Sequence, residues 1–99
     1  MRRAFIILPE AEGEITEAAD WYHAKREQLG VDFRRELRSR LVTIRGHPLR
    51  FPPVYKNGRA AFLSRFPYQV TYTADDEEII IVACTHHARD PEVWMKRLR

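Results

Sequence analysis

Apolar side chains recur through the first third of the chain at spacings of three and four residues, the period of an amphipathic α-helix. They begin just after Pro9, where glutamates crowd the first turn and favour a helix start because of the helix dipole. Gly30 is well suited to a left-handed cap and predicts the end of this helix. The apolar positions of the predicted helix are Ala11, Ile15, Ala18, Ala19, Tyr22 and Leu29.

A second helical pattern follows at once and predicts a helix from about Val31 to Arg45, stopped by Gly46-His47-Pro48. So short a link between two helices favours an antiparallel hairpin. The core stripe of the second helix is predicted to hold Phe33, Leu37, Leu41 and Ile44. Its opposite face carries Arg34, Arg35, Arg38 and Arg45, with Arg40 to one side. We interpret this face as solvated and partly neutralised by Asp32 and Glu36, in preference to a phosphate-binding role.

Strand-like segments flank the helical hairpin. One short strand is predicted over Arg3 to Leu8, and three more over about 59–65, 68–74 and 78–85. The turns around Pro67 and over residues 75–77 are short, which favours an antiparallel meander. Between the second helix and the meander, residues 47–58 are rich in proline and are predicted to form an irregular connector.

The predicted fold class is α+β, in the order β-α-α-β-β-β, with the helical hairpin on one face of a mainly antiparallel, twisted sheet. Within the meander, Ile79 to Cys84 has no polar alternate position, which predicts a central strand covered on both faces. The hairpin can cover one face only. We therefore expect the C-terminal segment from Pro91 to Arg99, a second copy or another protein to cover part of the other face. Ninety-nine residues can bury one such core, so we expect a single domain over 1–99.

Charge and cysteine content narrow the function classes. Lysine and arginine number 17 against 14 aspartate and glutamate, with arginine strongly preferred, which suits an anionic partner. Cys84 is the single cysteine, so no disulfide forms within the chain, and its apolar surroundings predict a packed thiol. The apolar start is too short for a signal peptide and no segment reaches the length of a membrane span, so we expect a cytoplasmic protein.

Cationic and imidazole side chains gather where the apolar strands end. Arg65 follows the first strand of the meander, and His86, His87 and Arg89 follow the last. A strand buried in a sheet holds such groups at defined positions, which is how a small protein builds a site. Cys84 and His86 should point to one side of the sheet and His87 to the other, and no fourth ligand is suitably spaced. We predict neither a metal site nor a cofactor.

Three motifs lie on this predicted framework in a specific order: Ala18-Ala19-Asp20-Trp21-Tyr22, then Arg65-Phe66-Pro67-Tyr68-Gln69-Val70-Thr71-Tyr72, then His86-His87-Ala88-Arg89-Asp90-Pro91 with Trp94. Over nearly its whole length the chain resembles the RelE/ParE superfamily of bacterial toxins, and most closely the ParE-like branch often labelled plasmid stabilisation proteins. The resemblance implies the toxin half of a type II toxin-antitoxin pair, which a cognate antitoxin neutralises.

Two mechanisms share the superfamily fold. ParE-like members bind DNA gyrase and trap it on cleaved DNA, and the resemblance to them implies growth inhibition with Arg65, His86, His87 and Arg89 as target-binding residues. RelE-like members cut messenger RNA in the ribosomal A site, which implies Arg65 with His87 or His86 as catalytic groups. Against cleavage, Trp94 stands where such nucleases tend to carry a proton-transferring residue, and indole exchanges no proton near neutral pH. A third alternative is a non-toxic remnant that retains only antitoxin binding.

Overall fold

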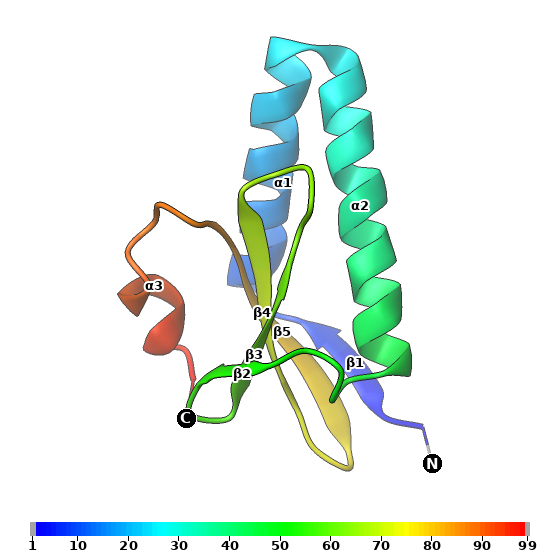
Figure 1. Cartoon of the computed structure of the whole chain (residues 1–99), viewed down its shortest axis with the longest axis vertical. Helices are drawn as coiled ribbons and strands as arrows, with labels where there is room; N and C mark the ends of the chain where they lie inside the picture. Colours follow the sequence, from blue (N-terminus) through cyan, green and yellow to red (C-terminus); the bar gives the residue numbers. More distant parts are fainter. Residues whose placement is uncertain (1, 99) are drawn as a thin grey trace.

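A helical hairpin lies against one face of a five-stranded sheet (Figure 1). This computed structural model describes residues 2–98. It confirms the predicted α+β class, the hairpin and the meander. The elements in chain order are β1 (Ala4–Ile7), α1 (Pro9–Lys25), α2 (Glu27–Gly46), β2 (Pro53–Tyr55), β3 (Gly58–Phe62), β4 (Tyr68–Ala74), β5 (Glu78–His86) and the short α3 (Glu92–Met95).

The strand order is β1-β5-β4-β3-β2, so β5 is an interior strand, as its uninterrupted apolar sequence predicts. β1 pairs with β5 in parallel, and the remaining neighbours are antiparallel. β2 lies in the connector that was predicted to be irregular, and that prediction was wrong. Pro53 and Tyr55 pair with Arg59 and Gly58 across a tight turn in which Lys56 has a φ of 50°. Proline is tolerated on an edge strand such as β2, because there the missing N–H can face solvent instead of a neighbouring strand.

The break between the helices falls at Arg26, not at Gly30, so the predicted end of the first helix and start of the second were both wrong. Arg26 is extended, with φ −164° and ψ 130°, and no described glycine has a positive φ. Gly30 instead lies inside α2, where α1 approaches it closely. A Cβ added at Gly30 would lie 2.8 Å from His23 Cβ and 3.0 Å from His23 Cα. Close helix packing, not capping, therefore explains this glycine.

The main core lies between the hairpin and the sheet. α1 contributes small side chains, which let it lie close to the sheet, and α2 contributes Phe33, Leu37 and Ile44. Toward the hairpin tip, the Tyr22 ring packs 5.4 Å from Phe33 and 4.7 Å from Phe66, measured between centroids. The predicted core stripes are thus confirmed except at Leu29, which lies in α2 and not in the first helix. The aromatic rings hold the β3–β4 loop against the hairpin.

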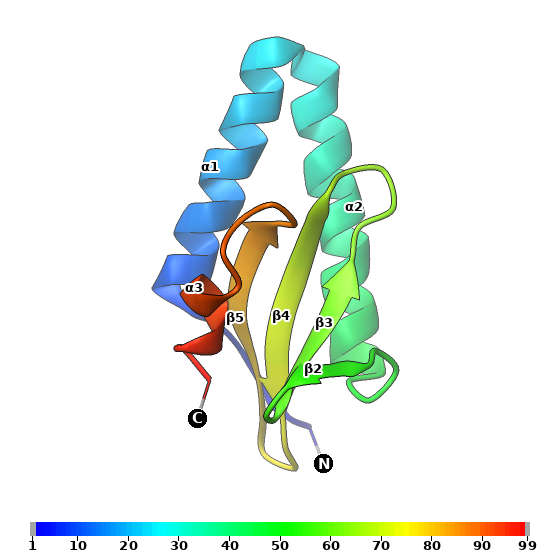
Figure 2. The ribbon, with the colours of Figure 1, turned by 60° about the vertical axis from the view of Figure 1, so that its left-hand side comes forward.

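The opposite face of the sheet is covered by the C-terminal segment, one of the three alternatives left open by the sequence. Trp94 and Leu98 pack there on Val82 and Ala83 and form with them a second core. Figure 2 shows α3 in front of β5, on the side of the sheet away from the hairpin. A bulge in β5 makes this possible: Thr71 pairs with Ala83 but Tyr72 with Ile81, which leaves Val82 as an extra residue. β5 is consequently buried on both sides.

The close approach at Gly30 yields a stability prediction. Gly30→Ala gains helix propensity of about 1 kcal/mol, but the methyl group must push α1 and α2 apart, at a cost of about 1–3 kcal/mol. We expect a net loss of up to about 2 kcal/mol in the free energy of unfolding, measured by urea denaturation. Gly13→Ala is the matched control, because nothing lies within 4 Å of its added Cβ, and it should stabilise by about 0.5–1 kcal/mol. Equal stabilisation by both would contradict the packing argument.

Candidate functional site

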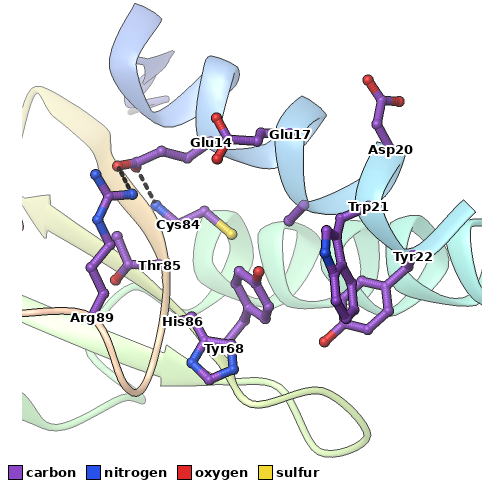
Figure 3. Close-up of a pocket in the computed structure, with 11 residues that line it drawn as sticks. Glu14, Glu17, Asp20, Trp21, Tyr22, Tyr68, Cys84, Thr85, His86 and Arg89 are labelled. Atoms are coloured by element: carbon purple, nitrogen blue, oxygen red, sulfur yellow. Dashed lines mark hydrogen bonds and ion pairs between the residues drawn. The ribbon is translucent and has the colours of Figure 1, made fainter. Parts of the chain in front are cut away.

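A cavity of about 570 Å³ opens between α1, the start of β4 and the end of β5 (Figure 3). α1 forms one wall with residues from Glu14 to Tyr22, and the strands form the other. The cavity takes in two of the residues predicted from the sequence, His86 and Arg89. Its other labelled lining residues are Glu14, Glu17, Asp20, Trp21, Tyr22, Tyr68, Cys84 and Thr85.

Trp21 forms the outer aromatic wall of the cavity. It is 54% exposed, although a residue of this size is usually well buried. Its ring meets Tyr22 edge-on at 5.1 Å, and the Nζ atom of Lys25 lies 4.8 Å from the ring centroid. Exposed tryptophan at the rim of an apolar hollow is typical of protein-binding surfaces, where it supplies a large contact area at little entropic cost.

Tyr68 forms the inner wall, with its ring centroid 5.2 Å from that of His86. Burial raises the pKa of the Tyr68 phenol, the nearby Tyr22, Cys84 and Glu17 raise it further, and only the Arg89 charge opposes them. The phenol therefore stays protonated near neutral pH. It offers a hydrogen-bond donor on the wall that Tyr68 shares with Thr85 and His86.

Glu14 organises the floor of the cavity. Its Oε1 atom accepts a hydrogen bond from the Cys84 amide at 3.0 Å, and both carboxylate oxygens accept from Arg97, at 3.1 and 3.0 Å. Arg97 also donates to the Val82 carbonyl at 3.1 Å, and Arg89 lies 3.7 Å from the same carboxylate. Three segments far apart in sequence thus meet at one side chain.

This cluster replaces a missing strand. β1 pairs only with Glu78 to Ile81, so the later residues of β5 have no strand beside them on that edge. There the carboxylate of Glu14 and the guanidinium of Arg97 satisfy one amide and one carbonyl of the backbone. This role was not predicted from the sequence, in which Glu14 was grouped with the glutamates after Pro9 that favour the helix start. One signal was present: Glu14 lies on the apolar stripe of α1, three residues after Ala11 and four before Ala18.

Arg65, a predicted site residue, lies outside the cavity, near α2. Its Nη1 atom is 3.4 Å from Asp32, and the backbone amides of Ser64 and Arg65 both donate to the Glu36 carboxylate. The pKa of Asp32 is lowered, first by a hydrogen bond from Gln28 and then by the charges of Arg65 and Arg35, which outweigh its partial burial. The carboxylates of α2 thereby fix the conformation of the β3–β4 loop.

The two histidines occupy opposite faces of the sheet, as strand alternation predicts. His86 lines the cavity with Cys84, and its Nδ1 atom accepts a hydrogen bond from the Ala88 amide at 2.9 Å. His87 lies on the other face, 5.2 Å from the Phe62 ring. Its amide donates to the Pro67 carbonyl at 2.8 Å, which holds it beside the β3–β4 loop that carries Arg65. Both histidines and Arg65 therefore lie at one end of the molecule, but their side chains do not converge on one point. Within residues 2–98, no group of three His, Cys, Asp or Glu side chains could hold a metal ion.

Comparison with known proteins shows which family the chain belongs to. Residues 5–91 match the family model described as "ParE toxin of type II toxin-antitoxin system, parDE". The chain belongs to the ParE toxin family. Among solved structures, the ParE-family fold matches a chain titled "Chromosomal ParDE TA system from P. aeruginosa", with a TM-score of 0.74, 12% identity, and coverage of 85% of this chain and 95% of that one. A search of curated protein sequences finds no significant match.

The family match confirms the resemblance read from the motifs. At 12% identity, the solved structure supports the shared fold and nothing finer. No helix in the described part of this ParE-family chain is both long and apolar enough to cross a membrane.

The cluster around Glu14 yields a second stability prediction. Glu14→Gln removes the charge that pairs with Arg97 while its side chain is only 12% exposed, so we expect the free energy of unfolding to fall by about 2–4 kcal/mol. Glu12→Gln, on the exposed side of the same helix, is the control and should change it by less than about 0.5 kcal/mol. Chemical denaturation measures both. Equal effects would show that Glu14 contributes nothing beyond surface charge.

The reactivity of the Cys84 thiol at pH 8 provides a test of its burial. Burial, with a smaller contribution from the Glu14 charge, raises the pKa of the Cys84 thiol to about 12. At pH 8 only about one thiol in ten thousand is then ionised, and the thiolate is the reactive form. The folded protein should resist an aromatic disulfide reagent at pH 8, whereas protein unfolded in guanidinium should react with one equivalent within minutes. Rapid reaction of the folded protein would contradict the buried position.

Proposed function

We propose that this ParE-family chain inhibits growth by binding DNA gyrase, and that a cognate antitoxin neutralises it. The family supplies the toxin-antitoxin context, and the similar fold belongs to a chain from a ParDE system, which supports a protein antitoxin as partner. Gyrase as target follows from the ParE-like resemblance. An activity on gyrase would be exercised in the cytoplasm.

The observation that carries the proposal is the set of aromatic and arginine side chains around the cavity. Trp21 is 54% exposed beside the apolar hollow, and Arg89 stands at its rim with 48% of its side chain exposed. Tryptophan, tyrosine and arginine around a pocket are the side chains that dominate protein–protein binding energies. All of them lie on α1, β4 or the turn that directly follows β5, so their positions are defined before any partner binds.

The same end is poorly arranged for RNA cleavage. A metal-free nuclease must bring a base, an acid and cations to one phosphate. Here Arg65 is drawn toward Asp32, and the loop amides that could hold a phosphate are occupied by Glu36. His86 and His87 lie on opposite faces, and Trp94 is buried in the second core. These contacts favour binding over catalysis.

A gyrase assay tests the proposal. The purified chain should inhibit supercoiling and accumulate cleaved DNA. Trp21→Ala, which removes the exposed wall of the cavity, should raise the concentration needed for half-inhibition at least tenfold. Tyr55→Ala is the control, because Tyr55 is a partly exposed aromatic residue on the distant edge strand β2 and should leave inhibition unchanged.

Three results would contradict the proposal. Unchanged supercoiling at saturating protein would remove gyrase as the target. Cleavage of messenger RNA on translating ribosomes, abolished by Arg65→Ala and His87→Ala, would establish the nuclease alternative instead. Harmless expression of the folded chain without any antitoxin would favour the non-toxic remnant.

A further inference from the structure

The cavity beside α1 carries negative charge that its own arginine does not neutralise. Glu14, Glu17 and Asp20 line it from the helix, and Arg89 lines it from the turn after β5. Glu14 is paired already, because Arg97 lies 3.0 Å and Arg89 3.7 Å from its carboxylate. Within residues 2–98, Glu17 and Asp20 form no ion pair, and both are exposed. Arg89 therefore serves Glu14, and the charge of the other two acids stays uncompensated.

Glu17 is the acid that acts inside the cavity. Figure 3 shows its carboxylate on the helix wall between Glu14 and Trp21, whereas Asp20 points away from the other labelled side chains. The Tyr68 phenol lies on the opposite wall, and its pKa is raised first by burial and also by the charge of Glu17. The negative field of this carboxylate therefore reaches across the cavity.

The aromatic walls are suited to hold a positive charge. Trp21, Tyr22 and Tyr68 line the cavity, and the negative face of an aromatic ring attracts a cation. The chain already uses one of these rings in this way: the ammonium of Lys25, which is not a lining residue, lies 4.8 Å from the centroid of Trp21. The cavity thus combines aromatic rings with one unpaired carboxylate, the two features that favour a bound cation.

These two features together select the side chain that fits. An aliphatic side chain would fill the hollow but would cover Glu17 without giving it a partner, and a desolvated, unpaired carboxylate is costly. A lysine ammonium is a compact, strongly hydrated point charge. An arginine guanidinium is planar and less strongly hydrated, so it can stack on the rings while its edge donates two hydrogen bonds to the carboxylate.

We infer that the cavity binds an arginine side chain of gyrase, with the guanidinium stacked against Trp21 and paired with Glu17. This inference rests on the proposed function and names the group on gyrase that the cavity recognises. Its volume of about 570 Å³ is within the range of about 300–1,000 Å³ in which pockets enclose most of a bound group. Glu17 is then the residue that sets specificity, because it rejects apolar and acidic side chains.

A nuclear magnetic resonance titration with a small probe tests the cavity without gyrase. N-acetyl-arginine amide should shift the indole N–H signal of Trp21 saturably, with a Kd of about 1–10 mM, and Glu17→Gln should weaken this binding at least about threefold. N-acetyl-citrulline amide has nearly the same shape without the charge and should give no saturable shift. The lysine and leucine derivatives should bind more weakly than arginine. The buried Trp94 indole is the internal reference.

Titration calorimetry with purified gyrase tests the occupant. At about 150 mM salt, Glu17→Gln should bind gyrase about fivefold and Glu17→Lys at least about 30-fold more weakly than the unmodified chain, with a smaller dependence of affinity on salt. Glu12→Lys makes the same change in net charge at an exposed position of α1 that does not line the cavity, and its affinity should stay within about twofold. Circular dichroism checks that every variant is folded.

The outcomes separate this inference from the proposed function. If the unmodified chain and Glu17→Lys bound gyrase equally, the inference would be overturned and gyrase would still stand as the target. A saturable shift with the leucine or citrulline derivative but not with the arginine derivative would also overturn it, in favour of an uncharged occupant. Absence of gyrase binding by the unmodified chain would overturn the proposed function and, with it, gyrase as the source of the arginine.

Discussion

The arrangement of this molecule depends on one carboxylate placed where a strand is missing. Glu14 accepts a hydrogen bond from the backbone of β5 and two from Arg97, and so joins α1, this interior strand and the C-terminal segment. A buried carboxylate is costly unless its charge and lone pairs are satisfied, and here both are. Because β1 ends early, α1 approaches the exposed edge of β5 directly, and the cavity forms where the helix passes the strand end.

The contact with Glu14 also depends on the segment that covers the opposite face of the sheet. Arg97 reaches Glu14 only because α3 folds back over Val82 and Ala83, where Trp94 and Leu98 bury the second side of β5. The bulge at Val82 serves both ends of this contact, since its carbonyl accepts from Arg97 and its side chain packs in the second core. Polar and apolar contacts therefore both hold the C-terminal segment against the sheet.

Charge is divided between the two helices of the hairpin. The acids of α1 face outward or bind Arg97, whereas Asp32 and Glu36 of α2 are occupied by the β3–β4 loop. This division leaves arginine on one surface and carboxylate on another. It also leaves Trp21 exposed near the tip of the hairpin, apart from the arginines of α2.

The sequence alone determined the α+β class, most core positions of both helices, the interior position of β5 and the opposite faces of His86 and His87. These follow from local periodicity, because side chains repeat every 3.6 residues in a helix and every two in a strand. The tertiary structure decided the break at Arg26, the strand β2, the packing role of Gly30 and the meeting of Glu14 with Arg97. Each of these depends on contacts between segments distant in sequence or on close approach of two backbones, and neither leaves a periodic signal. Arg65 shows the same limit: the strand predicted to reach it ends at Phe62, and only the packed α2 helix could bring Asp32 to its guanidinium in the loop that follows.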